Sequence, residues 1–373
     1  MESNGLEVLS KKKIPISIIT GFLGSGKTTL LNDIINFENF KNTLLIINEF
    51  GEISIDHHLI KKKSDDKIVL NNGCLCCSFA GDLVKTLDDT LKIKKKFDRI
   101  IVETSGLADP VPIMQTIVSD QIISEKIQFQ SLITVVDTVN FQNDFNNHLE
   151  NFKQIVSADI ILLSKTDISE KQKKKEVLDK LKSLNTHAKI FDKNSLNKNQ
   201  IKNLFVDVDI KSSVIDKIGS YKKNNIKFLH KKNSLTENNK VETISINIKD
   251  KITKDGLKLW LNALARFKSN NLLRMKGILK VNKQTILINA VQKVFHEPIN
   301  LKTWPFKDNY SKIVFITKGL KKEEILKTLK VLNFQKEKPL KKNQLSFSKK
   351  DYSNFVDCMN KFEALTTLDR HTK

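Results

Sequence analysis

The chain has few cysteines, no long apolar run and no signal-like N-terminus, and each of these absences excludes a class of protein. No apolar stretch in the 373 residues approaches the length of a bilayer span, so we expect no membrane-spanning helix. The stretch from Met1 to Lys13 is polar and lysine-rich, unlike the apolar core of a secretory signal. We therefore expect a cytoplasmic protein. Thiols stay reduced in that compartment, so the four cysteines do not predict a disulfide framework.

Acidic residues are outnumbered, because 64 lysines and arginines face 42 aspartates and glutamates, for a net charge of +22. Such a balance can indicate binding to nucleic acid or to an anionic membrane. Arginine is rare, however, and no aromatic-basic motif is present. The lysines are scattered and become dense only at Lys171–Lys182, Lys222–Lys232 and Lys336–Lys350. We interpret the charge as a compositional bias, and an RNA-associated ATPase is a minor alternative.

The most informative segment is Gly21-Phe-Leu-Gly-Ser-Gly-Lys-Thr28, which lies between the apolar run Ile14–Ile19 and a helical pattern over Thr29–Phe37. It fits the phosphate-loop pattern G-x-x-x-x-G-K-[ST] in the strand–loop–helix context that this pattern requires. The glycines allow several N–H groups to face one phosphate at the positive end of the helix dipole. Lys27 can reach the β- and γ-phosphates, and the Thr28 hydroxyl can bind Mg²⁺. The predicted phosphate-binding residues are Gly21, Gly24, Ser25, Gly26, Lys27, Thr28 and Thr29.

A further apolar strand pattern, over residues 99–103, ends in Glu103, and Gly106 follows three residues later. In phosphate-loop enzymes an acid at this point holds the water shell of Mg²⁺, and the glycine N–H can sense a γ-phosphate. We therefore predict Lys27, Thr28 and Glu103 as catalytic residues, and Thr28 and Glu103 as the residues that hold Mg²⁺. The simpler alternative is a buried strand that ends in an exposed acid.

The segment Ser164-Lys-Thr-Asp167 follows another apolar strand pattern. Lys165 can cover a guanine ring, and Asp167 can accept hydrogen bonds from the guanine N1 and N2 protons. Adenine presents no such donor pair, so Asp167 predicts a preference for GTP. Motifs of this kind usually begin with asparagine, and Ser164 stands there instead, which could weaken base affinity.

Three of the four cysteines lie within Cys74-Leu-Cys-Cys77. Reduced thiols crowded together can be deprotonated by a soft metal, of which Zn²⁺ is the common one. The run supplies at most three ligands, so a fourth must come from elsewhere in the chain, from water or from a partner. The predicted zinc ligands are Cys74, Cys76, Cys77 and Glu49. A reactive or merely buried thiol cluster is the alternative.

Apolar strands alternate with helical stretches up to about Asp209, and many strands are β-branched runs typical of a sheet buried on both faces. This predicts a doubly wound, mostly parallel α/β domain of the P-loop NTPase class, followed by a smaller α+β domain. The predicted strands of the first domain are Ile14–Ile19, Thr43–Asn48, Lys67–Leu70, Arg99–Glu103, Leu132–Asp137 and Ile160–Ser164. The predicted divisions are 14–210 for the GTPase domain, 211–240 for a linker, 241–334 for the second domain and 335–373 for a basic tail.

In this order the motifs closely resemble those of the CobW family of P-loop GTPases, a group of metallochaperone-like proteins. The matching segments are Gly21–Thr28, Asn48–Glu52, Gly73–Cys77, Glu103–Pro110, Ser164–Asp167 and Arg274–Leu279. The resemblance implies GTP hydrolysis with Mg²⁺, coupled to loading or delivery of a metal, most often zinc, to a metal-requiring client protein. It also implies a CobW-type C-terminal domain.

Three readings of the cargo remain open at this point. Zinc for client proteins is favoured because the ligands are thiolates. Cobalt for cobalamin synthesis and iron for a nitrile hydratase are alternatives, because affinity alone does not name the physiological metal. A zinc-storage module whose nucleotide turnover is incidental belongs to a different functional class.

Overall fold

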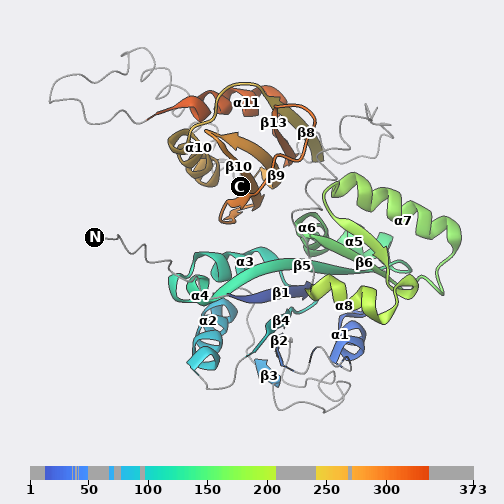
Figure 1. Ribbon diagram of the computed structural model, residues 1–373. Coiled ribbons are helices and arrows are strands. Elements are labelled where there is room, and N and C mark those ends of the chain that lie inside the picture. Colours follow the sequence, from blue (N-terminus) through green and yellow to red (C-terminus); the bar gives the residue numbers. More distant parts are fainter. Residues whose placement is uncertain are drawn as a thin grey trace, which may run out of the picture.

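The computed structural model describes residues 13–35, 37, 40, 42–48, 67–70, 77–92, 97–206, 241–267 and 271–335. They form two stacked units, each built around its own sheet (Figure 1). Within this part of the chain, no helix is both long and apolar enough to cross a membrane. The predicted boundaries at residues 210, 240 and 334 stay predictions, because the segments around them fall largely outside the described ranges.

The first sheet has seven strands in the order β3-β2-β4-β1-β5-β6-β7, and every neighbouring pair is parallel. The strands are β1 (Ile14–Thr20), β2 (Thr43–Asn48), β3 (Lys67–Leu70), β4 (Arg99–Glu103), β5 (Ile127–Asp137), β6 (Ile160–Ser164) and β7 (Lys189–Asp192). The predicted doubly wound parallel architecture is therefore confirmed. Parallel order brings the carboxyl ends of all strands to one edge, where ligands of such sheets bind.

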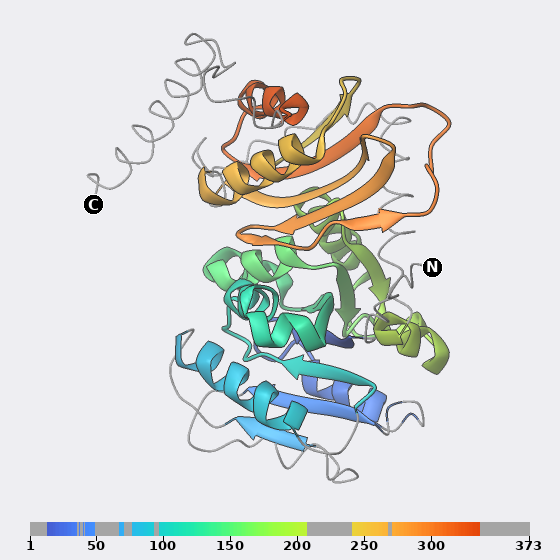
Figure 2. The ribbon, with the colours of Figure 1, turned by 60° about the vertical axis from the view of Figure 1, so that its left-hand side comes forward.

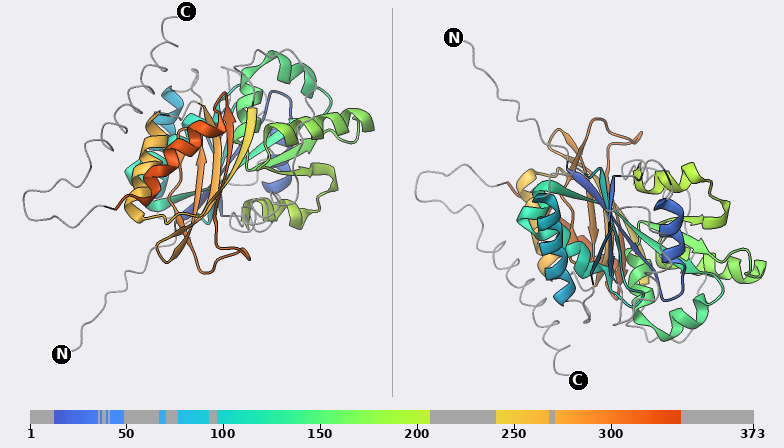
Figure 3. Two further views of the ribbon diagram at one scale, coloured as in Figure 1. Left: turned by 90° about the horizontal axis from the view of Figure 1, so that it is seen from above. Right: turned by 90° about the horizontal axis from the view of Figure 1, so that it is seen from below.

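Helices cover both faces of this sheet, with α1 and α2 on opposite sides (Figure 3). They are α1 (Lys27–Ile35), α2 (Cys77–Lys92), α3 (Pro110–Ser119), α4 (Gln121–Lys126), α5 (Phe141–Asn147), α6 (Leu149–Ser157), α7 (Lys171–Leu184) and α8 (Lys198–Val206). Strand β6 shows why both faces are apolar. Ile160 and Leu162 pack in the core shared with α1 and α8, whereas Ile161 and Leu163 pack with α6 and α7.

The second sheet is antiparallel, with the strand order β11-β10-β9-β13-β8 and β12 paired to β10. Its strands are β8 (Val241–Ile248), β9 (Leu272–Val281), β10 (Gln284–Val291), β11 (Val294–Phe295), β12 (Ile299–Leu301) and β13 (Ser311–Lys318). Helices α10 (Lys254–Phe267) and α11 (Lys322–Thr328) cover its far face, with the buried Trp260 in their core (Figure 2). The near face packs on the first unit, where Leu273 and Ile316 contact Val156 of α6.

The phosphate-loop helix begins at Lys27, where the sequence pattern predicts Thr29. In the second unit, helix α11 ends at Thr328, after which residues Leu329–Asn333 form a 3₁₀ turn. This tighter turn places the carbonyl oxygen of Leu332 2.9 Å from the backbone nitrogen of Thr253, at the start of α10, where the N–H donates to it. A continued α-helix would follow the apolar period but would lose this contact between elements.

Candidate nucleotide-binding site

The loop between β1 and α1 has the backbone conformation that a phosphate loop requires. Gly21, Gly24 and Gly26 have φ angles of 145°, 67° and 95°, which residues with side chains rarely adopt. A Cβ atom on Gly21 would also lie 2.3 Å from the carbonyl oxygen of Val135. Substitution at Gly21 is therefore opposed both by its φ angle and by the close approach of β5.

The predicted catalytic side chains lie together at the carboxyl edge of the sheet. Lys27 is buried, and its Nζ donates to the carbonyl oxygens of Gly21 at 2.9 Å and Phe22 at 3.1 Å. The hydroxyl of Thr28 donates to Oε1 of Glu103 at 3.3 Å, and Glu103 itself is buried at the end of β4. Two hard oxygen donors at this separation fit the preference of Mg²⁺ for oxygen ligands.

The segment after Glu103 packs directly on the phosphate loop. Thr104 donates from its backbone N–H to the carbonyl of Ile19 at 3.0 Å and from its hydroxyl to the Thr20 hydroxyl at 2.8 Å. A Cβ atom on Gly106 would lie 2.7 Å from the backbone nitrogen of Leu23. Gly106 therefore packs closely on the backbone of the phosphate loop, and only glycine allows this approach.

Ser164 connects the predicted guanine-reading segment to the phosphate loop. Its hydroxyl contacts the carbonyl oxygen of Ser25 at 2.6 Å and that of Val136 at 3.2 Å. Lys165 follows with a φ angle of 55°, and its Nζ donates to Oδ2 of Asp137 at 2.7 Å. Burial alone would raise the pKa of Asp137, but hydrogen bonds from Lys165, Asn140 and backbone N–H groups hold it below its usual value.

Asp167 is exposed and stands at the rim of the same edge. Its Oδ1 accepts a hydrogen bond from Nδ2 of Asn194 at 2.9 Å, and Asn194 also donates to the hydroxyl of Thr166 at 3.1 Å. Asn194 follows β7, so two neighbouring strand ends hold the carboxylate. Fixing the carboxylate before a base arrives lowers the entropy lost on binding.

Sequence reasoning did not single out Asp137 or Asn194 as site residues. Asp137 had a signal, because it ends a predicted strand at the same edge as Glu103. No sequence pattern marks Asn194, because the four residues of the preceding strand β7 are all half-buried and show no clear apolar period. Its position depends on the pairing of β7 with β6.

Most of the predicted zinc site lies outside the described residues. Cys74, Cys76 and Glu49 fall there, and Cys77 is described only as the first residue of α2. Elsewhere in the described residues, no three histidine, cysteine, aspartate or glutamate side chains come close enough together to hold a metal. The backbone nevertheless brings the relevant strands together, because Leu70 at the end of β3 pairs with Asn48 at the end of β2.

Two family models match the chain in sequence. Residues 15–192 match the CobW/HypB/UreG nucleotide-binding domain, and residues 241–332 match the C-terminal domain of the cobalamin synthesis protein CobW. The chain belongs to the CobW family. The parallel sheet with its phosphate loop is the nucleotide-binding domain of this family member, and the antiparallel sheet is its CobW C-terminal domain.

Curated proteins similar to this CobW family member carry zinc-related names. The zinc chaperone YjiA of Escherichia coli (strain K12) is 29% identical over 318 residues, which cover 84% of this chain and 96% of that protein. The zinc-regulated GTPase metalloprotein activator 1 of Schizosaccharomyces pombe is 32% identical over 186 residues, or 48% of this chain and 45% of that protein. The zinc chaperone CobW of Sinorhizobium sp is 34% identical over 199 residues, 46% of this chain and 56% of that one. The latter two matches thus span about half the length of the relatives.

A solved structure has the same fold. The crystal structure of the Zn(II)-bound YjiA GTPase from Escherichia coli superposes with a TM-score of 0.58 and 23% identity, covering 87% of this chain and all of that one. Both units of this family member therefore share their architecture with that protein.

Proposed function

We propose that this protein is a GTPase that binds zinc and delivers it to client proteins, with GTP binding and hydrolysis controlling loading and release. The observation that carries the GTPase part is the convergence of three separate segments at one sheet edge. Ser164 bonds to the phosphate loop at 2.6 Å, and Thr28 of that loop bonds to Glu103 at 3.3 Å. The zinc part is supported by the names of the relatives and by the cysteine run.

In the proposed enzyme, Lys27 exchanges its bonds to two loop carbonyls for bonds to the β- and γ-phosphates. This exchange carries a small energetic cost, because the ammonium group is already desolvated and held at the loop. Thr28 and Glu103 would hold Mg²⁺, which neutralises charge on the phosphates when it is bound. Asp167, with its orientation fixed by Asn194, would accept from the guanine N1 and N2 protons, and Lys165 would cover the ring.

Cys74, Cys76 and Cys77 would bind one Zn²⁺ as thiolates, with Glu49 as the candidate fourth ligand. The run lies in the chain between the phosphate loop and Glu103. A γ-phosphate that orders this segment would assemble the metal site, and hydrolysis would loosen it. Three thiolates and one weaker ligand suit transfer, because a client ligand can replace the fourth.

The test combines hydrolysis with metal titration on the reduced full chain. GTP and ATP turnover are measured for the wild type and for Lys27→Ala, and zinc affinity is measured with a non-hydrolysable GTP analogue and with GDP. We expect GTP turnover that Lys27→Ala abolishes, and a preference for GTP over ATP. Zinc should bind about 5–150-fold more tightly in the analogue state, which corresponds to a coupling of about 1–3 kcal/mol. Replacing Cys76 and Cys77 by serine should lower zinc affinity but leave metal-free GTP binding nearly intact.

Each part of the proposal can fail separately. Unchanged turnover in Lys27→Ala would contradict the GTPase assignment. Equal zinc affinity in the analogue and GDP states would contradict delivery and favour a storage module. An affinity for cobalt or iron that depends on the nucleotide state, together with a zinc affinity that does not, would reassign the cargo.

A further inference from the structure

Helix α6 lies between the parallel sheet and the C-terminal domain (Figure 1). At its start, the ring of His148 lies 4.6 Å from the ring of Phe22 in the phosphate loop. Lys153 forms an ion pair with Asp109 at 3.0 Å, beside the segment that follows Glu103. This nine-residue helix and its N-cap therefore contact both the phosphate loop and the segment that contains Gly106.

Gln154 contacts the segment that contains Gly106 directly. Its Nε2 donates to the carbonyl oxygens of Gly106 and Ala108, each at 3.0 Å, and the side chain is fully buried. Gly106 is thus held on one side by Gln154 and on the other by the backbone of Leu23. The Oε1 atom of Gln154 has no hydrogen-bond partner among the described residues. A buried oxygen without a hydrogen-bond partner destabilises the folded state by about 1–3 kcal/mol. An apolar side chain of equal length would avoid this penalty, so packing alone does not account for Gln154.

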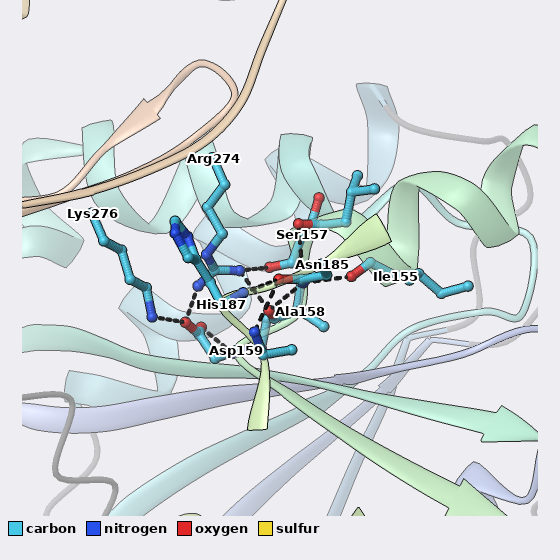
Figure 4. Close-up of polar contacts among 11 residues, drawn as sticks. Ile155, Ser157, Ala158, Asp159, Asn185, His187, Arg274 and Lys276 are labelled. Carbon is cyan, nitrogen blue, oxygen red and sulfur yellow. Dashed lines mark hydrogen bonds and ion pairs between the residues drawn. The ribbon is translucent and has the colours of Figure 1, made fainter. Parts of the chain in front are cut away.

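The other end of α6 is held by the C-terminal domain. Nη1 of Arg274, on β9, donates to the carbonyl oxygens of Ser157 and Ala158 at 2.6 Å each, and Nη2 pairs with Asp159 (Figure 4). Arg274 is completely buried. Its charge lies at the negative end of the helix dipole, where a cation is stabilised. Ser157 is three residues from Gln154, so the two contacts lie within one turn of α6.

We propose that Gln154 is a positioning residue for Gly106 in GTP hydrolysis and that Arg274 acts through α6 to hold Gln154 in place, a role that rests on the GTPase activity proposed above. Movement of Gly106 towards or away from a γ-phosphate must either break the two Gln154 bonds or move α6. Movement of α6 in turn disturbs the bonds of Arg274. The C-terminal domain is therefore coupled to the nucleotide state, and by linkage nucleotide affinity depends on how that domain is docked.

The experiment uses the full chain with Gln154→Met, which keeps length and removes the donors, and Arg274→Lys, which keeps the charge and loses the planar fork. Lys280→Ala is the matched control, because Lys280 is a cation on the same strand whose bond to Asn309 stays within the C-terminal domain. Single-turnover GTP hydrolysis, GDP affinity and thermal unfolding are measured for each. We expect the hydrolysis rate of Gln154→Met to fall at least about tenfold, with GDP affinity within about twofold of wild type. The hydrolysis rate of Arg274→Lys should also fall. The rate of the double variant should fall by a smaller factor than the product of the two single-variant factors.

The proposal would be overturned if Gln154→Met and Arg274→Lys fold and keep the wild-type hydrolysis rate. It would also be overturned if the rate of the double variant falls by the full product of the two single-variant factors. A wild-type chain that does not hydrolyse GTP would contradict the proposed function instead. If Arg274→Lys does not fold, amide hydrogen exchange of the wild type decides the coupling. Slower exchange across residues 149–159 and 272–276 with the GTP analogue than with GDP would support it, and equal exchange would contradict it.

Discussion

At the scale of single residues, Ser164 shows how a short side chain can take a position at which asparagine is usual. Strand β6 ends beside the phosphate loop, so the serine hydroxyl reaches the Ser25 carbonyl at 2.6 Å without a longer side chain. The Cβ of Ser164 is also only 3.8 Å from the place where a Cβ on Gly26 would lie. Serine at this position therefore ties the predicted guanine-reading segment to the phosphate loop.

We predict that Ser164→Ala weakens binding of a GTP analogue about fivefold, because the loss of the hydrogen bond that the hydroxyl donates corresponds to about 1 kcal/mol. Ser169→Ala, in the loop that follows, is the matched control, since the Ser169 hydroxyl has no partner among the described residues. Calorimetric titration measures both variants. Equal affinities for Ser164→Ala and wild type would show that the tie does not support binding.

At the scale of the element, the C-terminus of α6 is satisfied by side chains from distant parts of the chain. The last carbonyl groups of a helix have no partner within it. Here Nδ2 of Asn185 donates to the carbonyl oxygens of Ile155 at 2.8 Å, Val156 at 3.3 Å and Ala158 at 2.9 Å (Figure 4). Oδ1 of Asn185 accepts from the N–H groups that follow it, so one buried amide joins the end of α6 to the start of β7.

Replacing Asn185 by alanine should destabilise the protein by about 3 kcal/mol or more, because several buried backbone groups lose their partner at once. Asn147→Ala is the control, because Asn147 makes comparable bonds from an exposed site on α5 and should change stability by only about 0.5 kcal/mol. Urea denaturation followed by circular dichroism measures the difference. Similar losses for the two variants would rule out a special contribution of Asn185.

At the scale of the whole molecule, the two units meet around a buried cluster of charges. Asp159 faces Arg274 and Lys276, and the carboxylate is 3.6 Å from Nζ of Lys276. Burial lowers the pKa of Lys276 to about 8, with a further lowering by Arg274 and an opposing effect of Asp159. Burial also lowers the pKa of the nearby His296 to about 4, so its ring is neutral at physiological pH.

We predict that the free energy of unfolding rises as the pH increases from about 8 to 10.5, the interval between the folded and the ordinary pKa of Lys276. In this interval the unfolded chain keeps a proton on Lys276 that the folded chain has released, so raising the pH favours the folded state. The slope from this group is at most about 1.4 kcal/mol per pH unit. Besides burial, the charged neighbours Arg274, Asp159 and Lys189 shift this pKa.

Denaturation at several pH values tests this with Lys276→Met, which should remove the rise. Lys280→Met, on the same strand, should retain it. Identical pH slopes in Lys276→Met and wild type would contradict the assignment to Lys276.

The amino-acid sequence by itself determined the elements whose signal is local. Strands β2, β3, β4 and β6 begin and end at the residues that the sequence pattern predicts. In β4 and β6 the apolar runs reflect burial on both faces of the parallel sheet. The phosphate loop could also be predicted from the sequence, because the glycines that its backbone conformation requires all lie within eight residues. Ser164, Lys165 and Asp167 were likewise predicted from one short segment, and their role in guanine recognition stays a prediction.

Tertiary structure alone decided which distant residues meet at and behind the site. Asn194 reaches Asp167 only because β7 pairs with β6, and Gln154 reaches Gly106 only because α6 packs under that segment. Arg274 has no local pattern that marks it as a partner of α6, since 117 residues separate it from Ser157. Hydrogen bonds across such separations depend on how sheets and helices stack, and no periodicity in one segment encodes the position of another.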